Sequence, residues 1–218
     1  MKSFVFINAN LLDVRAGTLV PGGSVYVEDG RIKEVSDRPF GGTKAQSIDL
    51  KGRTLMPGLC DAHVHVTQLV ANTLKLRDAA PSYVSAQSSV VLRDMIHRGF
   101  TTVRDAAGAD YGIAAAVDEG YFVGPRLLFS GHALSQTGGH ADMRSRGEDV
   151  DYFCPACAGR TGRVCDGDHE VRRAARDELR KGATQIKIMV SGGVTSPLDR
   201  IDSTQFSIGE MRAAVEEA

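Results

Sequence analysis

From residue 55 onward, strand-like and helix-like patterns alternate, and this alternation constrains the fold more than any other feature. Short apolar segments predict β-strands, whereas longer segments with apolar residues at helical spacing and a following glycine predict helices. The predicted strands are residues 59–66, 100–105, 126–130 and 184–190, and the predicted helices are 82–97, 111–119, 169–181 and one that starts at Ser207. Such alternation favours parallel β/α units.

Four such units are too few to close a barrel. A (β/α)8 TIM-type barrel needs eight strands and typically ~250 residues, and four strands would leave sheet edges exposed. We therefore expect residues 57–218 to form the first half of such a barrel, and the chain to be the N-terminal half of a larger enzyme. Residues 131–167 are expected to form a long loop, and a capping box from Ser207 to Glu210 is expected to start the last helix.

The first 56 residues have a different pattern, typical of strands and turns. Alternating segments at 24–28 and 31–35 flank Asp29 and Gly30, a pair that favours a tight hairpin turn. Glycine and proline divide the rest of the segment. We expect residues 1–56 to form a small N-terminal β-sandwich segment, separate from the barrel.

The composition excludes several classes of partner. The chain is 42% hydrophobic and 24% charged, with a net charge of −1, which is typical of a globular protein. No basic excess indicates binding to nucleic acid or to an anionic membrane. The N-terminus has too short an apolar stretch for a secretory signal. We expect a cytoplasmic protein that acts on a small molecule or a dipeptide and forms a homo-oligomer.

The strongest functional motif is His63 and His65, two residues apart at the end of the first predicted strand of the barrel. Side chains on a strand alternate between faces, so both imidazoles are expected to project to one side. Imidazole is a common ligand of zinc and similar divalent metals. Asp61 is near enough to orient a ring nitrogen. The alternative is a pair of ordinary histidines on a half-buried strand.

Lys187 is the second functional signal, because it lies within the predicted strand 184–190. The alternation places Lys187 on the same face as Gln185 and Met189. A lysine inside a barrel is costly without a partner or a function, and burial favours the neutral amine of any lysine. A neutral amine can add carbon dioxide to form a carbamate, which would bridge two metals. The alternative is a structural lysine paired with a carboxylate.

Loops after the predicted strands carry the other candidates. His140, in the loop after the third strand, is a candidate for binding a substrate carboxylate or carbonyl, since barrel active sites lie at the C-terminal ends of strands. The alternative is a histidine that caps local backbone. His132 is a weaker candidate, and Arg104 and Asp105 are expected to support the metal ligands. Glycines in the sequence SGGV at 191–194 would allow close approach of a metal or substrate.

Three cysteines follow the pattern C-x2-C-x7-C at Cys154, Cys157 and Cys165, with His169 shortly after. These residues could form a structural zinc site, but the spacing matches no common zinc motif. Free thiols, or a disulfide in an oxidising compartment, are the alternatives. We expect these cysteines to be dispensable for catalysis.

Four motifs together resemble the amidohydrolase superfamily, and the resemblance covers essentially the whole chain. They are PGLCDAHVH at 57–65, TTVRD at 101–105, GGH at 138–140 and IKI at 186–188. The chain resembles in particular the imidazolonepropionase-like branch, which contains metal-dependent Xaa-Pro dipeptidases and related carboxypeptidases. This resemblance implies that His63 and His65 bind metal, and that carboxylated Lys187 bridges two zinc ions. Cobalt, manganese or iron would also suit these ligands.

The same resemblance places His140 near the substrate. It also implies two further histidine ligands on strands five and six, and an aspartate on strand eight that is both ligand and general base. These strands are not in this sequence.

The expected activity is metal-dependent hydrolysis of an amide bond, in a dipeptide with a C-terminal proline or in an N-acyl amino acid. One alternative is a cyclic amidase of the imidazolonepropionase type. Another is a non-catalytic half-barrel that binds metal or is completed by another chain. The reading frame beyond Ala218 would distinguish the last alternative, because an enzyme needs the missing ligands.

Overall fold

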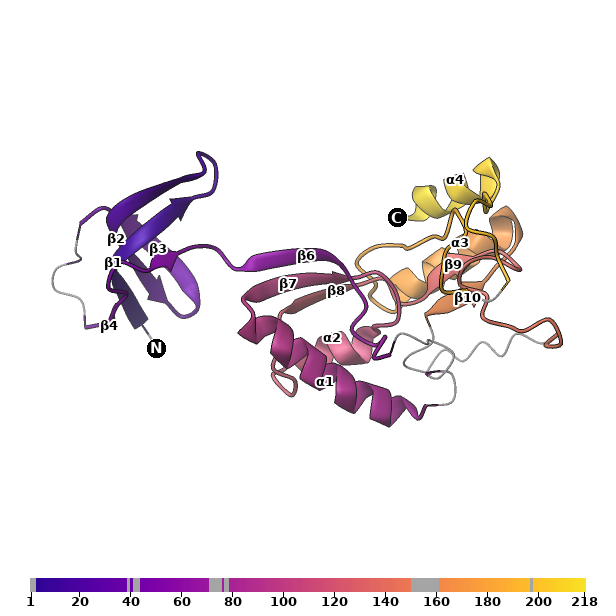
Figure 1. Ribbon diagram of the computed structural model, residues 1–218, viewed down its shortest axis with the longest axis horizontal. Helices are drawn as coiled ribbons and strands as arrows, with labels where there is room; N and C mark the ends of the chain where they lie inside the picture. Colours follow the sequence, from indigo (N-terminus) through magenta and orange to yellow (C-terminus); the bar gives the residue numbers. More distant parts are fainter. Residues whose placement is uncertain are drawn as a thin grey trace. The chain divides into compact units, whose positions relative to one another are not determined.

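The computed structural model describes residues 3–38, 40, 44–70, 76, 79–149, 161–196 and 198–218. The chain divides into two compact units, Met1–Gly58 and Leu59–Ala218. The strands of the first unit are β1 (Ser3–Asp13), β2 (Thr18–Glu28), β3 (Arg31–Ser36), β4 (Gln46–Asp49) and β5 (Thr54–Leu55). Figure 1 shows the elements of both units.

The five strands of the first unit share one hydrogen-bonded sheet in the order β3-β2-β1-β4, with β5 also paired to β1. The described strands of the first unit therefore form one sheet, and the small β-sandwich segment stays a prediction. Strand β1 is central to this sheet, and its pairing with β2 is irregular between Phe6 and Leu11. The irregularity lets one long strand pair in parallel first with β4 and then with β5.

The hairpin between β2 and β3 confirms the predicted turn. Glu28 pairs with Arg31, so that only Asp29 and Gly30 form the loop. Both have positive φ angles, 49° and 73°, as a two-residue turn between twisted strands requires.

The second unit starts with three parallel strands, β6 (Leu59–Val64), β7 (Phe100–Asp105) and β8 (Arg126–Phe129). They are neighbours in the order β6-β7-β8. Helix α1 (Pro81–His97) connects β6 to β7, and α2 (Tyr111–Asp118) connects β7 to β8. These elements confirm the predicted β/α order. Proline at the first turn of α1 and Asp110, whose side chain accepts from the backbone N–H of Ile113, explain where the two helices begin.

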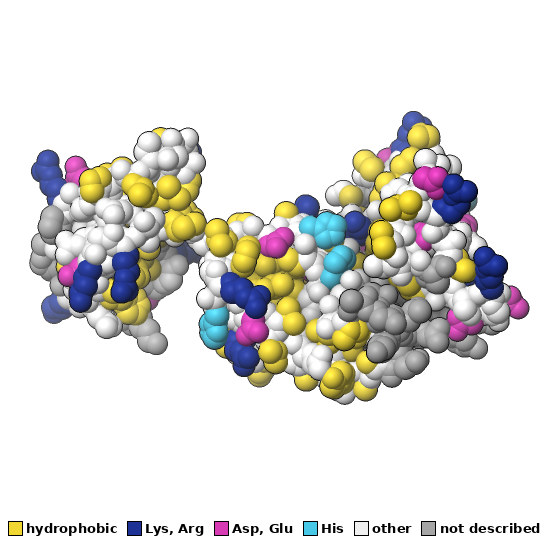
Figure 2. All heavy atoms as spheres, viewed as in Figure 1, with side chains coloured by type: hydrophobic (Ala, Val, Ile, Leu, Met, Phe, Trp, Pro, Cys, Tyr) yellow, Lys and Arg dark blue, Asp and Glu magenta, His cyan; other side chains and the backbone are white. Residues whose placement is uncertain are grey.

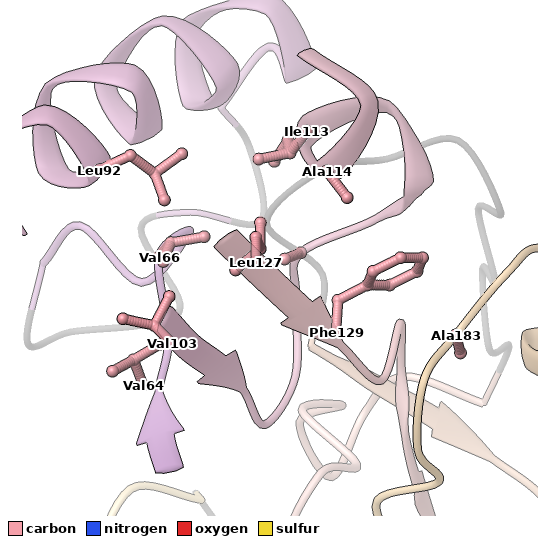
Figure 3. Packing of buried hydrophobic residues seen from close by; sticks show 10 residues of the cluster. Val64, Val66, Leu92, Val103, Ile113, Ala114, Leu127, Phe129 and Ala183 are labelled. Carbon is pink, nitrogen blue, oxygen red and sulfur yellow. The ribbon is translucent and has the colours of Figure 1, made fainter. Parts of the chain in front are cut away.

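Apolar side chains from both helices bury one face of this sheet. Leu92 of α1 and Ile113 of α2 pack in one cluster with Val64 and Val103 from the strands. Figure 3 shows these side chains pointing toward one another between the helices and the strands. Because strand side chains alternate, the positions next to Val64 project from the opposite face.

The region after β8 differs in part from the predicted long loop. It contains two short strands, β9 (Ala133–Ser135) and β10 (Gly162–Val164), which pair in parallel. Residues 150–160, which include Cys154 and Cys157, lie outside the described residues. The predicted loop is therefore wrong at these two strands, whose three residues each are too short to give a period-two signal.

The predicted strand 184–190 runs beside β8 and β9 but is only partly regular. Thr184 donates its backbone N–H to the carbonyl of Phe129, and Ile188 forms a parallel bridge with Leu134. Between these contacts the neighbouring chain turns at Gly131, whose φ is 68°. This turn interrupts the ladder, which explains why a single bridge replaces a full strand.

Two helices complete the second unit. They are α3 (Gly167–Arg180) and α4 (Ile208–Glu217), and α4 has the predicted capping box between Ser207 and Glu210. Their apolar faces form a second buried cluster, against which Ile186 and Ile188 pack. Within the described residues, no helix combines the length and apolar character needed to cross a bilayer.

Candidate metal centre

His63 and His65 lie side by side at the C-terminal end of β6. Their ring centroids are 5.3 Å apart, with the rings inclined at 71°. Val64 between them is buried under the helices, so the two imidazoles project to the other face, as alternation requires. Figure 2 shows histidine side chains next to each other at the surface of the second unit.

One nitrogen of His65 is already engaged. Its Nδ1 lies 3.1 Å from the backbone carbonyl oxygen of Ala107. A carbonyl can only accept a hydrogen bond, so Nδ1 carries the proton and Nε2 keeps its lone pair. This arrangement is typical of metal-binding histidines, whose second nitrogen donates to a carbonyl or carboxylate.

Asp105 fixes the backbone around that hydrogen bond. Its fully buried carboxylate accepts from the backbone N–H groups of Val66, Ala107 and Ala109, at 2.7, 3.0 and 3.1 Å. Burial raises the pKa of Asp105 to about 6, although the three N–H groups favour the charged form. The Asp105 carboxylate thus connects Val66, which follows His65, with Ala107, whose carbonyl accepts the hydrogen bond of the His65 ring. This contact agrees with the supporting role expected for Asp105.

Asp61 and Arg104 act on the backbone of the same strand. Asp61 accepts from the backbone N–H of His63 at 3.1 Å, and Arg104 donates from Nε to the carbonyl oxygen of Ala62 at 2.8 Å. The prediction that Asp61 orients a ring nitrogen is therefore wrong. Asp61 is only two residues before His63, and a carboxylate at this spacing readily accepts a hydrogen bond from the backbone N–H of the later residue.

Lys187 lies on the segment beside β9, on the face predicted from the alternation. Ile186 and Ile188 pack toward the helices, whereas Met189 packs against a small cluster on the other side. Gln185, which shares the face of Lys187, donates from Nε2 to the carbonyl oxygen of Asp105 at 2.9 Å. Lys187 is half-buried.

The charge of Lys187 acts on His63. Burial, followed by the positive charges of Lys187, His65 and Arg104, lowers the pKa of His63, while Asp61 acts in the opposite direction. A lowered pKa keeps His63 neutral near pH 7, and only the neutral ring can bind a metal. The structure thus places His63 beside His65 and within the electrostatic reach of Lys187.

These side chains fit a divalent metal in their chemistry. His65 offers an oriented lone pair and His63 a neutral ring. Within the described ranges, no group of three or more histidine, cysteine, aspartate or glutamate side chains could hold a metal. Lys187, whose charge acts on His63, is a candidate for a third ligand, and it becomes an oxygen ligand only after carboxylation.

His140 lies against the loop that follows Lys187. Its Nδ1 is 2.9 Å from Ser196 Oγ, and its backbone N–H donates to Gln205 Oε1 at 2.8 Å. A Cβ atom on Gly193 would lie 2.1 Å from the ring. The backbone at Gly193 thus approaches the His140 ring closely, whereas the expected approach of a metal or substrate to the SGGV sequence stays a prediction.

His132 has a structural partner. Its Nδ1 lies 3.2 Å from Oε1 of Glu178, a buried residue of α3. Burial by itself would raise the pKa of Glu178, but the hydrogen bonds and charge of His132 and the charge of Lys181 lower it. Glu178 was not expected from the sequence as a functional residue, although an acidic residue on the buried face of helix 169–181 is a usable signal.

Cys165 belongs to a hydrophobic core. It is 3% exposed and packs with Leu134 and Val171, and burial raises the pKa of its thiol to about 12. Zinc binds the thiolate, so this environment does not favour a zinc ligand. Cys60 and Cys165 are both free thiols.

We expect iodoacetamide to label Cys60 but not Cys165 in the native protein, because the reactive thiolate is suppressed at Cys165 and Cys60 is exposed. Peptide mass mapping after labelling at pH 8 would measure both sites. The same reaction in urea is the control, since both peptides should then be labelled. Equal native labelling of the two thiols would contradict the buried position of Cys165.

Comparison with known proteins identifies the family. The model of the Amidohydrolase family matches residues 54–218. The chain belongs to this family. Ochratoxinase from Aspergillus niger is 34% identical over 233 residues, which cover 96% of this chain and 48% of that protein. The chain thus spans about half the length of its curated relatives.

Solved structures of amidohydrolases extend the similarity to the whole chain. A prolidase complexed with N-methylphosphonate-L-proline is 46% identical, with a TM-score of 0.96, and the match covers 100% of this chain and 53% of that one. A Xaa-Pro dipeptidase with bound methionine in its active site is 27% identical, with a TM-score of 0.85, over 100% of this chain and 54% of that one. These neighbours confirm the predicted resemblance to Xaa-Pro dipeptidases.

Proposed function

We propose that this chain is part of a metal-dependent amidohydrolase that hydrolyses an amide bond, in a dipeptide with a C-terminal proline or in an N-acyl amino acid. The observation that carries the proposal is the similarity, 46% identity over the whole chain, to a prolidase solved with a proline phosphonate. The adjacent rings of His63 and His65 and the electrostatic effect of Lys187 on His63 support it.

His63 and His65 would hold one divalent ion, and Lys187 would bridge it to a second. Two such ions, when bound, supply Lewis-acid activation of water and of the scissile carbonyl. The chain itself prepares the site through the hydrogen bond that leaves Nε2 of His65 unprotonated. We propose zinc as the metal, with cobalt, manganese and iron as substitutes that suit the same ligands.

Lys187 can serve as a bridge only after modification. Its neutral Nζ would attack the carbon of carbon dioxide, and loss of one N–H proton would leave a carbamate with one negative charge. The carbamate offers two oxygens in place of one ammonium. The electrostatic effect of Lys187 on His63 supports this step, because an ammonium near the two histidines would repel metal ions.

His140 would contact the substrate. Its ring rests on Gly193, six residues after Lys187 along the chain, and its side chain is 21% exposed. A histidine held at this position can bind a substrate carboxylate or carbonyl. The remaining ligands and the general base would come from later strands of a complete (β/α)8 barrel.

Ochratoxinase is similar over 96% of this chain, and this similarity makes an ochratoxin the second candidate substrate. A screen of the full-length protein would separate the candidates. We would assay Xaa-Pro dipeptides, N-acyl amino acids, an ochratoxin and imidazolonepropionate, and measure bound metal in the same samples.

We expect hydrolysis of Xaa-Pro dipeptides that is lost after dialysis against a chelator and restored by zinc. The untreated and the dialysed protein, matched in concentration and in circular dichroism, form the control pair. Hydrolysis of the ochratoxin alone would favour the second candidate. A metal-loaded, folded protein that hydrolyses none of these compounds would support the non-catalytic alternative.

A further inference from the structure

His140 is held by a closed set of contacts between two loops. Its backbone N–H donates to Gln205 Oε1 at 2.8 Å, and Gln205 Nε2 donates to Asp199 Oδ2 at 3.0 Å. Asp199 Oδ2 lies 3.4 Å from His140 Nδ1 and also accepts from the backbone N–H of Gly193 at 3.2 Å. One carboxylate oxygen thus connects the ring, the glutamine and the loop after Lys187.

The carboxylate is well shielded from solvent. The side chain of Asp199 is 2% exposed, and its other oxygen, Oδ1, is buried without a hydrogen-bond partner in the part of the chain that the structure describes. A buried negative charge interacts strongly with nearby dipoles. Its effect on His140 is therefore larger than that of an exposed aspartate at the same distance.

Two tautomers of the neutral ring are compatible with the contact between His140 Nδ1 and Ser196 Oγ, because a hydroxyl can donate or accept. If Nδ1 accepted from the hydroxyl, its lone pair would also face the Asp199 carboxylate, which is repulsive. If Nδ1 carries the proton, the N–H dipole faces the carboxylate and Ser196 Oγ together, which is attractive. The buried charge of Asp199 decides between them.

We propose that Asp199 is a positioning residue for His140: it holds the ring proton on Nδ1 and so leaves Nε2 as the nitrogen that meets the substrate. Gln205 fixes the backbone of His140 relative to the same carboxylate, and Gly193 provides room for the ring. This inference rests on the proposed substrate contact of His140 only for its catalytic consequence.

The tautomer can be measured without substrate. In full-length protein labelled with nitrogen-15 histidine, the two ring nitrogens of His140 would be assigned by loss of their signals in His140→Gln. At a pH where the ring is neutral, we expect Nδ1 to resonate in the protonated range and Nε2 in the unprotonated range. In Asp199→Asn, we expect a shift of the population toward the tautomer protonated on Nε2.

Asp202→Asn is the matched control, because it removes an exposed carboxylate from the same loop whose described partner is Arg200. This variant should keep the wild-type tautomer. A wild-type ring protonated on Nε2, or an unchanged tautomer in Asp199→Asn, would overturn the inference whatever the substrate proves to be. If Asp199→Asn does not fold, Asp199→Glu and Gly193→Ala would displace the carboxylate and the ring respectively and should alter the same signals.

The catalytic consequence is tested with the best Xaa-Pro dipeptide from the screen. Loss of a charge-assisted contact should raise KM about 10-fold in Asp199→Asn, with kcat nearly unchanged, because His140 would bind the ground state and the transition state alike. Asp202→Asn should leave both constants at wild-type values. An altered tautomer with unchanged KM would retain the positioning of His140 but reject its substrate contact, so the two proposals fail separately.

Discussion

Lys187→Ala should lose the second of two metal ions and lower the hydrolytic activity of the full-length protein by at least ~100-fold. Replacing a residue that only supports a metal ligand already weakens metal binding or activity, and loss of the bridging ligand itself should cost more. A carbamate is the only form in which this side chain supplies a negatively charged bridge. An unmodified ammonium would repel two divalent ions at a cost of several kcal/mol. Metal content per chain, measured by mass spectrometry, is the primary readout.

Three further observations test the same step. Lys187→Glu should recover part of the metal, because glutamate restores the charge but is shorter than the carbamate. Lys33→Ala, a lysine of the first unit that is half-exposed, is the control and should keep both metals. A crystal structure with two metals should show a planar three-atom extension on Nζ, and a plain amine in an active binuclear enzyme would refute the proposed mechanism.

His63→Ala and His65→Ala should each lower bound metal and activity by at least ~10-fold, because each removes a direct ligand. The His65 variant should have the larger effect on affinity, since the hydrogen bond from Nδ1 to the carbonyl of Ala107 already orients its ring and no such bond is observed for His63 within the described residues. Titration of metal-free protein with zinc, followed by calorimetry, would measure both affinities.

His97→Ala is the matched control for these two variants. His97 is an exposed residue in the last turn of α1, where a cation stabilises the helix end by a few tenths of a kcal/mol to about 1 kcal/mol. The His97→Ala variant should therefore lose a little stability but bind as much metal as the wild-type protein. Full metal content in both His63→Ala and His65→Ala would remove the assignment of these residues as ligands.

Periodicity was sufficient to predict most of the regular structure. The strand at 100–105 and the helices α1 and α2 agree with their predicted bounds to within one residue, and Gly99 and Gly120 mark the ends of the two helices. The hairpin at Asp29 and Gly30 follows from local backbone preferences alone. The predicted strand 184–190, which contains Lys187, was less predictable, since its hydrogen-bonded ladder depends on a turn at Gly131 in the neighbouring segment.

The same distinction holds for the site. Strand alternation alone placed His63 with His65, and Lys187 with Gln185, because side-chain direction on a strand is a local property. The contacts that prepare these residues are not local: Ala107 accepts from His65 across 42 positions, and Gln205 meets His140 across 65. Folding brings such distant groups together through packing and hydrogen bonding, so they leave no periodic signal in the sequence. The sequence therefore determined which side chains could carry the chemistry, and the tertiary structure decided which nitrogen of His65 is available for a metal and how Asp199 meets His140.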